Sequence, residues 1–151
     1  MRKNRRIEIT VSHQRLNVLE DYKIVFSTPV STALRGLGCE SGSLKTPPGN
    51  FVVSEKFGDG EPVGTIFRGR IATGEMAESN SPEDQITSRI LWLDGVEPSN
   101  ANTKGRYIYI HGTNDEARLG APVSHGCIRL ANTAIIDLFD LVETGTSVTI
   151  A

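Results

Sequence analysis

The residues of this chain best suited to covalent chemistry lie in one segment, residues 111–130. It contains Cys127, one of only two cysteines, and two of the three histidines. A cysteine nucleophile needs a base that forms the thiolate and backbone N–H groups that stabilise an oxyanion. His111 can serve as the base, while Gly112 and Gly126 let a substrate approach the backbone closely. This combination is typical of cysteine–histidine acyl transfer, with the N–H groups of Gly126 and Cys127 as the expected oxyanion hole.

Three polar side chains beside the cysteine have a functional and a structural interpretation. His125 could line the substrate cleft or stabilise its own loop. The Ser124 hydroxyl could bind substrate, but serine in a tight turn commonly bonds its own backbone. Arg129 could clamp a carboxylate, or it could form a structural ion pair with Asp or Glu. The sequence leaves all three questions open.

Helices and strands must hold these residues in place. Residues 107–110 are aromatic and β-branched, which predicts a buried strand with His111 at or just past its end. After the cysteine, Asn132 can act as an N-cap, and apolar residues recur at helical spacing from Ile135 to Val142. Gly145 then suits the C-terminal cap. One short helix should therefore follow the cysteine loop.

The rest of the chain is predicted to form strands and loops. The expected strands are residues 6–11, 15–19, 22–26, 51–54, 63–70, 89–94 and 147–150. Loop composition dominates residues 29–50, 71–88 and 96–105. We therefore expect a mainly β fold, a β-sandwich or barrel-like mixed sheet with one short helix, in a single domain covering residues 1–151.

Composition limits the classes of function. The chain has 151 residues, 38% hydrophobic and 23% charged, with a net charge of −2. This composition is that of a globular domain and provides no basic field for nucleic acid, so we expect no nucleic-acid partner. The basic start at residues 1–6 is not followed by an unbroken apolar run, so neither a secretory signal nor membrane insertion is expected. A cytoplasmic location follows as the expectation from sequence.

The two cysteines are expected to stay free thiols, with Cys39 as a small buried space-filler. Structural zinc sites use closely spaced pairs of ligands. The cysteines and histidines of this chain form no such set, so we expect neither a metal nor another cofactor. The sequence leaves the oligomeric state open.

Several motifs together resemble one enzyme family. The segments His111-Gly112-Thr113 and 124–130 (SHGCIRL), with Gly120 between them, resemble the signature of L,D-transpeptidases with the YkuD-type catalytic domain. Residues 14–16, 29–32, 46–51 and 145–148 also follow the family's order. The resemblance covers almost the whole chain, except for about residues 69–102.

The resemblance implies an activity and further roles. Members of this family use the histidine as base, with the next residue's carbonyl, here that of Gly112, orienting its ring. The residue corresponding to Tyr109 lines the cleft, although a strand aromatic is usually core. The implied partners are peptidoglycan stem peptides or muropeptides in the cell envelope, which contrasts with the missing signal.

The implied reaction is an acyl transfer in two steps. Cys127 would attack the bond that joins an L-centre to D-alanine, and an amine would then take the acyl group to form a 3–3 cross-link. Water as acceptor would make the same site an L,D-carboxypeptidase or muropeptide hydrolase. A non-catalytic peptidoglycan-binding module is the remaining alternative.

Overall fold

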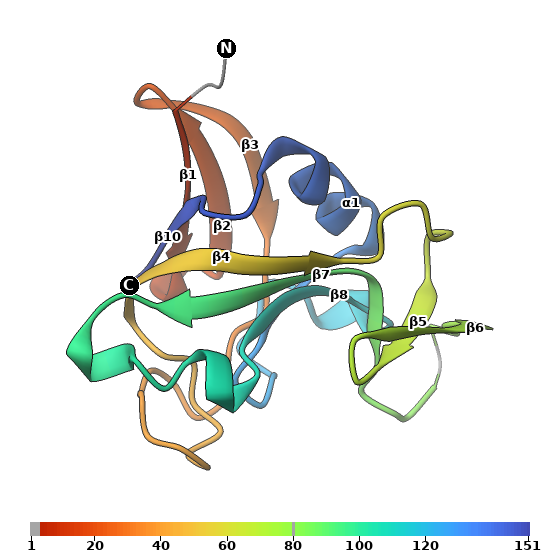
Figure 1. The fold of residues 1–151 in the computed structure, drawn as a ribbon. Helices are drawn as coiled ribbons and strands as arrows, with labels where there is room; N and C mark the ends of the chain where they lie inside the picture. The colour runs from red at the N-terminus through yellow and green to blue at the C-terminus, as the bar shows by residue number, and fades with distance from the viewer. Residues whose placement is uncertain (1–3, 80) are drawn as a thin grey trace.

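The structure is a computed structural model that describes residues 4–79 and 81–151. Within these residues the chain forms ten strands, one α-helix and four short 3-10 helices (Figure 1). The strands are β1 (Arg5–Thr10), β2 (Arg15–Glu20), β3 (Lys23–Pro29), β4 (Gly49–Phe57), β5 (Thr65–Arg68), β6 (Ile71–Met76), β7 (Ile86–Gly95), β8 (Tyr109–Thr113), β9 (Ile128–Leu130) and β10 (Ser147–Ile150). The helices are α1 (Asn132–Leu141), η1 (Val11–His13), η2 (Pro98–Asn100), η3 (Lys104–Arg106) and η4 (Glu116–Arg118).

All ten strands belong to one mixed sheet. The main path runs β3-β2-β1-β10-β4-β7-β5-β6, and β8 branches from β7 and carries β9 at its other edge. The β1–β10 and β8–β9 pairs are parallel, and the other pairs are antiparallel. The longest strand, β7, therefore connects the β4 side of the sheet to the β8–β9 branch.

The sheet curls until its two ends meet. The segment after β3 pairs with β9, because Ser31 and Arg129 exchange two backbone hydrogen bonds, of 3.0 and 2.9 Å. The Ser124 N–H donates to the Thr32 carbonyl oxygen at 3.0 Å, which ties the approach to β9 to the same segment. This closure confirms the predicted mainly β, barrel-like mixed sheet with one short helix after the cysteine loop.

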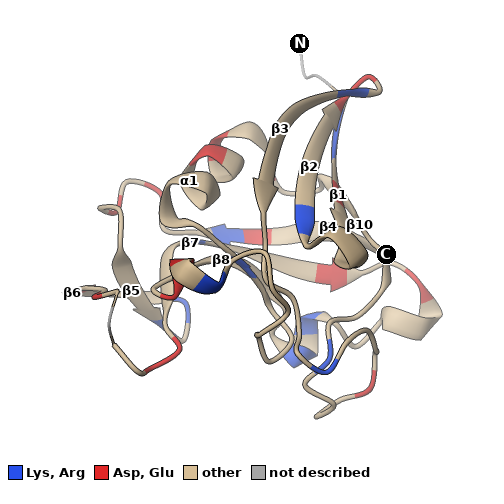
Figure 2. Cartoon of the chain, turned by 180° about the vertical axis from the view of Figure 1, so that it is seen from behind, with Lys and Arg blue, Asp and Glu red and all other residues tan. Residues whose placement is uncertain are grey.

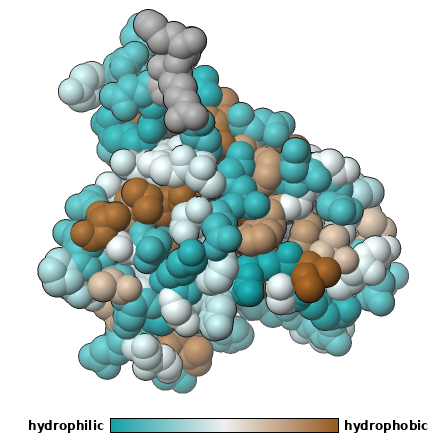
Figure 3. All heavy atoms as spheres, viewed as in Figure 1, coloured by the Kyte–Doolittle hydropathy of each residue, from teal (hydrophilic) through white to brown (hydrophobic). Residues whose placement is uncertain are grey.

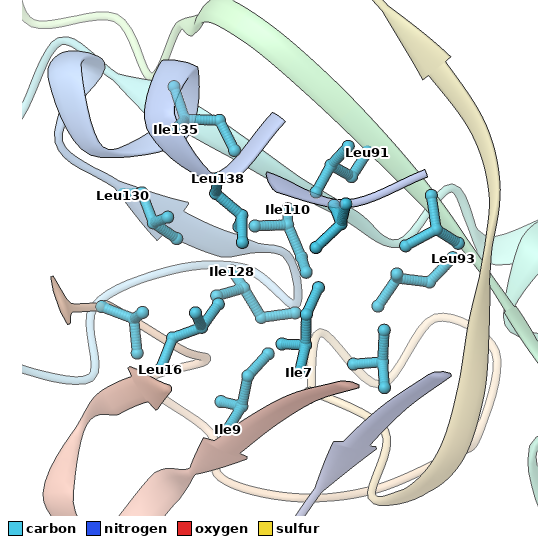
Figure 4. Close-up of a cluster of buried hydrophobic side chains, with 14 of the residues drawn as sticks. Ile7, Ile9, Leu16, Leu91, Leu93, Ile110, Ile128, Leu130, Ile135 and Leu138 are labelled. Atoms are coloured by element: carbon cyan, nitrogen blue, oxygen red, sulfur yellow. The ribbon is translucent and has the colours of Figure 1, made fainter. Parts of the chain in front are cut away.

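The main hydrophobic core fills the inside of this curl. Buried side chains from β1, β2, β7, β8 and β9 meet those of α1, as Figure 4 shows for Ile7, Leu16, Leu91, Ile128 and Leu138. The Lys56 ammonium of β4 donates to the carbonyl oxygens of Phe139 and Val142 at the end of α1. These bonds satisfy carbonyl groups that a helix C-terminus leaves unpaired, so α1 is held against the sheet.

Two strands were missed by the sequence interpretation. Strand β6 lies in the segment predicted to be loop, and it pairs with β5 through a two-residue turn in which Gly69 and Arg70 have φ of +55° and +66°. Two left-handed residues are the requirement of a tight hairpin, and Arg70 gives no sequence signal for it. Strand β9 has three residues, too few for a periodic pattern.

Three local predictions were wrong. Residues 107 and 108 precede the strand, which begins at Tyr109, because Tyr107 adopts a left-handed conformation with φ of +58°. Asn132 is the first helical residue and not the N-cap, since its side chain binds Thr113, Thr87 and Ser88 instead. The helix ends at Leu141, with Val142 as C-cap, so Gly145 belongs to the following turn.

The surface carries charges of both signs without a single-sign face in the view of Figure 2. In Figure 3 hydrophilic residues dominate, with small separate hydrophobic groups. Within the described ranges, no helix has the length and apolar character needed to cross a bilayer.

Candidate active site

The β8–β9 pair positions both the predicted base and the predicted nucleophile. His111 lies in β8, and Cys127 directly precedes β9. In this parallel pair Ile110 lies opposite Ile128, and His111 lies opposite Arg129. Because side chains alternate along a strand, Ile110 and Ile128 point into the main core. His111 therefore projects from the opposite face, which is also the face of Tyr109 and Cys127. His111 and Cys127 therefore lie on the same face of this strand pair.

His111 is the third residue of β8, not a residue at the strand end as predicted. Its side chain is buried, and Nδ1 lies 2.6 Å from the carbonyl oxygen of Gly112. A carbonyl oxygen can only accept, so Nδ1 carries the proton and Nε2 keeps its lone pair. Burial lowers the pKa of His111 below its usual 6.5, against an opposing effect of the Gly112 hydrogen bond. The ring is therefore neutral at pH 7, with a basic Nε2.

Cys127 is half-buried at the start of β9. The Tyr109 N–H donates to its sulfur at 3.4 Å, and the thiol donates to the carbonyl oxygen of Tyr107 at 3.4 Å. Burial raises the pKa of Cys127 to about 11, although the Tyr109 N–H stabilises the thiolate. The resting group is therefore a thiol, which would need a base to become a thiolate nucleophile.

Steric crowding explains the two glycines. A Cβ on Gly112 would lie 2.5 Å from the backbone oxygen of Thr87, on the neighbouring strand β7. Gly126 has φ of +131°, in the region that favours glycine, and a Cβ there would lie 3.3 Å from the backbone oxygen of Lys45. A larger residue thus clashes with the backbone at Gly112, and at Gly126 it is disfavoured by the positive φ and by a tight contact.

The loop before Cys127 is held by its own hydrogen bonds. The buried Ser124 hydroxyl donates to the carbonyl oxygen of Cys127 at 2.6 Å and accepts the Gly126 N–H at 3.2 Å. Thr46 donates to the Gly126 carbonyl oxygen at 2.9 Å. Ser124 thus takes the structural role that the sequence offered as its alternative. Because the Gly126 N–H is engaged in this turn, the Cys127 N–H is the stronger candidate for the oxyanion hole.

Arg129 and His125 both lie close to the carboxylate of Asp84. Arg129 is 4% exposed, with Nη2 at 2.8 Å from Asp84 and Nη1 at 3.6 Å from Asp115. It therefore forms the structural ion pair that the sequence left open. His125 is exposed, with Nδ1 at 3.8 Å from Asp84. Asp84 was missed because it lies in a polar segment far from the signature in sequence.

Tyr109 belongs to the aromatic packing under the site. Its buried ring contacts Trp92 edge-on at 5.8 Å, and its hydroxyl accepts a hydrogen bond from Arg70 at 2.9 Å. The side chain is therefore core, as strand aromatics usually are, and Cys127 packs against the cluster to which it belongs. The sequence also missed Tyr107, whose carbonyl oxygen holds the thiol and whose exposed ring stacks on Trp92.

Two hollows are lined by residues of the candidate site. One of about 290 Å³ contains Cys127 and His125, together with Leu44, Arg106 and Ile108. A second, of about 180 Å³, is lined by Ser81, Pro82, Glu83, Asp84, Asp115, Arg118 and Arg129. A further hollow, of about 620 Å³, lies at the end of α1 and is not lined by either cysteine. Of these three hollows, the first is the one that Cys127 lines, so it offers a substrate access to the sulfur.

Cys39 is not among the residues that line the hollow of Cys127, and its sulfur lies 3.9 Å from the carbonyl oxygen of Pro48. Both cysteines are free thiols. Among residues 4–79 and 81–151, no group of three His, Cys, Asp or Glu side chains is placed to hold a metal ion.

Comparison with known proteins gives consistent matches to one family. Residues 4–150 match the family described as YkuD, L,D-transpeptidase catalytic domain. The putative L,D-transpeptidase YqjB of Bacillus subtilis is 38% identical over 73 residues, which are 48% of this chain and 39% of the relative. The chain thus spans well under half the length of that relative.

Solved structures share the fold at low identity. An L,D-transpeptidase from Xylanimonas cellulosilytica matches with a TM-score of 0.64 and 21% identity, over 100% of this chain and 62% of that one. L,D-transpeptidase 3 from Mycobacterium tuberculosis, in complex with a faropenem-derived adduct, matches with a TM-score of 0.63 and 17% identity. This match covers 98% of this chain and 60% of that one. Because the family match extends over residues 4–150, the chain belongs to the YkuD family of L,D-transpeptidase catalytic domains.

Proposed function

We propose that this chain is a cysteine acyltransferase that acts on peptidoglycan stem peptides. It cleaves the L,D bond before D-alanine and transfers the acyl group to an amine, which makes a 3–3 cross-link. One observation carries the proposal: Cys127 and His111 share one face of the β8–β9 pair, while the Gly112 carbonyl leaves Nε2 of His111 free to accept a proton. The family to which the chain belongs supplies the substrate class.

In the first step, His111 Nε2 takes the thiol proton while the Cys127 sulfur attacks the carbonyl carbon of the third stem residue. The resulting oxyanion accepts a hydrogen bond from the Cys127 N–H. His111 then gives the proton to the nitrogen of the departing D-alanine. The C–N bond breaks, D-alanine leaves as a free amine, and a thioester on Cys127 remains.

In the second step, an amine from a second stem peptide attacks the thioester. His111 takes a proton from the attacking amine as the C–N bond of the new amide forms, and it passes this proton to the sulfur as the C–S bond breaks. His111 thus ends each half of the cycle neutral. This role fits a buried imidazole whose pKa lies below 6.5, because such a ring does not retain the proton.

The raised pKa of Cys127 fits a nucleophile that is activated only on substrate binding. A thiol with a pKa of about 11 is almost entirely protonated at pH 7. Stray electrophiles therefore meet an unreactive group, and the neighbouring imidazole supplies the base when a carbonyl is in place.

Mass spectrometry of the products from a purified disaccharide tetrapeptide muropeptide tests the proposal. The parent protein should release D-alanine and form a cross-linked dimer, whereas Cys127→Ala should form neither. Tripeptide without dimer would identify the alternative, an L,D-carboxypeptidase or muropeptide hydrolase. Equal absence of turnover in the parent and in Cys127→Ala, with retained binding, would instead identify a non-catalytic binding module.

A further inference from the structure

One carboxylate beside the catalytic face is held in place from several sides. Asp84 lies between two backbone groups that both bind Asn114, the residue directly after β8. The Asn114 amide donates to the Glu83 carbonyl oxygen at 2.9 Å and accepts the Gln85 N–H at 3.1 Å. The backbone of Asp84 is thereby fixed to the strand that carries His111.

The side-chain contacts of Asp84 involve one of its two carboxylate oxygens, Oδ2. Arg129 contacts Oδ2 at 2.8 Å, and His125 is 3.8 Å from the same oxygen. Among the described residues, no hydrogen bond to Oδ1 is present, and the contacts from Arg129 and His125 are both to Oδ2. The side chain is 43% exposed, whereas Arg129 is almost fully buried beneath it. One oxygen thus anchors the group, and the other remains available to a ligand.

Asp84 and His125, which lie 3.8 Å apart, line one hollow each. Asp84 lines the hollow of about 180 Å³. Its neighbour His125 lines the hollow that contains Cys127. The negative charge of Asp84 raises the pKa of both His111 and Cys127, and the positive charge of Arg129 lowers both. Asp84 is therefore close enough for its charge to act on the catalytic pair.

The neighbouring carboxylate of Asp115 is less exposed than that of Asp84, 27% against 43%, and it also pairs with Arg118. Asp115 uses one oxygen for two contacts from Arg118, one of them at 2.6 Å from Nε, and the same oxygen faces Arg129. Of the acids lining this hollow, Asp84 is the one whose charge acts on both catalytic groups.

We propose that Asp84 binds the ammonium group of the acyl acceptor and so directs the thioester toward an amine rather than water. The acceptor enters the hollow beside Asp84 and Arg129, while the acyl donor occupies the hollow that contains Cys127. The inference rests on the proposed function and deepens it. Asp84 is a specificity-determining residue, because water carries no charge for it to recognise.

A carboxylate such as Asp84 suits the charge of an amine acceptor. An alkylamine is a cation at pH 7, and a carboxylate with a free oxygen attracts it and accepts an N–H hydrogen bond. Arg129 offsets part of the charge on Asp84, so the ammonium is attracted without being held permanently. The amine loses one proton to solvent, attacks the thioester carbonyl, and passes a second proton through His111 to the departing sulfur. The products are an amide, the Cys127 thiol and one proton released.

The test measures how the thioester divides between amine and water. The full chain receives a tetrapeptide donor and one of two acceptors: Nα-acetyl-lysine amide, which is cationic at pH 7, or methoxyamine, which is neutral. Released D-alanine reports donor cleavage, and mass spectrometry gives the ratio of amide to hydrolysed product. The variants are Asp84→Asn, Asp84→Glu and, as a matched control, Asp137→Asn at an exposed carboxylate on α1.

We expect Asp84→Asn to lower the amide-to-hydrolysis ratio about tenfold with the lysine derivative, the usual effect of losing one hydrogen-bonded charge pair. The ratio with methoxyamine should stay within about twofold, because a neutral acceptor gains nothing from the charge. Asp84→Glu should recover most of the loss, and Asp137→Asn should match the parent.

Salt gives a second measurement that needs no variant. Raising the ionic strength should raise the KM of the parent for the lysine derivative and leave that for methoxyamine unchanged. An equal loss with both acceptors in Asp84→Asn would mean that Asp84 only positions Arg129, and no loss with either would also overturn the inference. If the parent releases no D-alanine, the proposed function itself fails, and the inference with it.

Discussion

At the scale of single residues, the site depends on which atom holds each proton. The Gly112 carbonyl places the His111 proton on Nδ1, and burial keeps the ring neutral. Burial likewise keeps the Cys127 proton on sulfur, with Tyr107 accepting it in a hydrogen bond. Two neutral groups on one face can exchange a proton without leaving an unpaired buried charge, which would be costly.

Cys127 and His111 should behave as one unit. Removing either should abolish efficient acylation, and the double variant should be scarcely worse than Cys127→Ala, because coupled catalytic groups are not additive. A carbapenem serves as the reagent, because its strained β-lactam carbonyl can acylate an activated thiol. Intact-mass analysis should show an adduct on the parent and none on Cys127→Ala.

The same assay separates base from scaffold. His111→Ala should slow adduct formation by about 10²–10⁴-fold, the usual effect of a positioned general base. Cys39→Ala should keep the parental rate, because its thiol does not line the hollow of Cys127 and bonds the Pro48 carbonyl oxygen instead. An adduct that persists without Cys127, or that forms at the parental rate without His111, would show that the nucleophile or the base is misassigned.

The rate of acylation should depend on pH in a direction set by the two pKa shifts. The pKa of His111 is lowered, so the base stays neutral until pH falls below 6.5, and only then should the rate decline. In His111→Ala the rate should follow the thiolate fraction, rising about tenfold per pH unit toward the Cys127 pKa of about 11. Stopped-flow measurements from pH 5 to about 10 test both profiles. A parental rate that climbs steadily through this range would contradict base assistance by His111.

At the scale of elements, the site depends on the contact between β7 and β8. Thr87 lies opposite Gly112, and the pairing then shifts before Ile90 meets His111. The Thr87 and Ser88 hydroxyls bind the Asn132 side chain oxygen, and the Asn132 amide donates to the Thr113 carbonyl oxygen at 3.0 Å. The start of α1 is thereby joined to both strands directly behind His111.

Gly112→Ala should separate these strands. The new Cβ would lie 2.5 Å from a backbone oxygen that cannot move without breaking the β7–β8 pairing. We expect a loss of about 1–3 kcal/mol in the free energy of unfolding, together with a lower acylation rate through displacement of His111. Urea denaturation measures the first effect, and the carbapenem assay measures the second.

Gly105→Ala is the matched control, because a Cβ there meets no atom within 4 Å. Its stability should stay within about 0.5 kcal/mol of the parent. Equal losses in the two variants would show that the crowding at Gly112 is not the cause.

At the scale of the whole molecule, one core supports both ends of the curled sheet. Side chains of β1 and β2 pack against those of β8, β9 and α1 (Figure 4). Because β9 has only three residues and pairs in its strand ladder with β8 alone, its position depends on this packing and on the two bonds with Ser31. The packing that stabilises the core therefore also positions Cys127.

Ile128→Ala should therefore affect stability and activity together. Removing this fully buried side chain should cost about 2–5 kcal/mol in the free energy of unfolding. It should also slow acylation, since Cys127 precedes it directly. Ile71→Ala, at an exposed position of β6, should change stability by less than about 0.5 kcal/mol. A stable but inactive Ile128→Ala protein, or an unstable but fully active one, would contradict this coupling.

The sequence alone predicted the mainly β fold, most of the strands and the helix that follows the cysteine loop. It could do so because alternation and helical spacing are local properties, as in residues 6–11 and from Ile135 to Val142. It also singled out Cys127 and His111, because a nucleophile and a base need particular side chains whose types are visible in the chain. Short or turn-dependent elements such as β9 and β6 carried too little local pattern.

Tertiary structure alone decided what surrounds those two residues. The sequence left Arg129 between a carboxylate clamp and an ion pair, and the fold brings Asp84 and Asp115 to it. Nothing local marks Asp84 as its partner, because the contact depends on how the polar segment before β7 crosses to β9. The neutral state of His111 and the raised pKa of Cys127 likewise arise from burial, which is a property of the packed molecule. Residue type determines which chemistry is available, and the surrounding dielectric and charges determine the protonation state in which it begins.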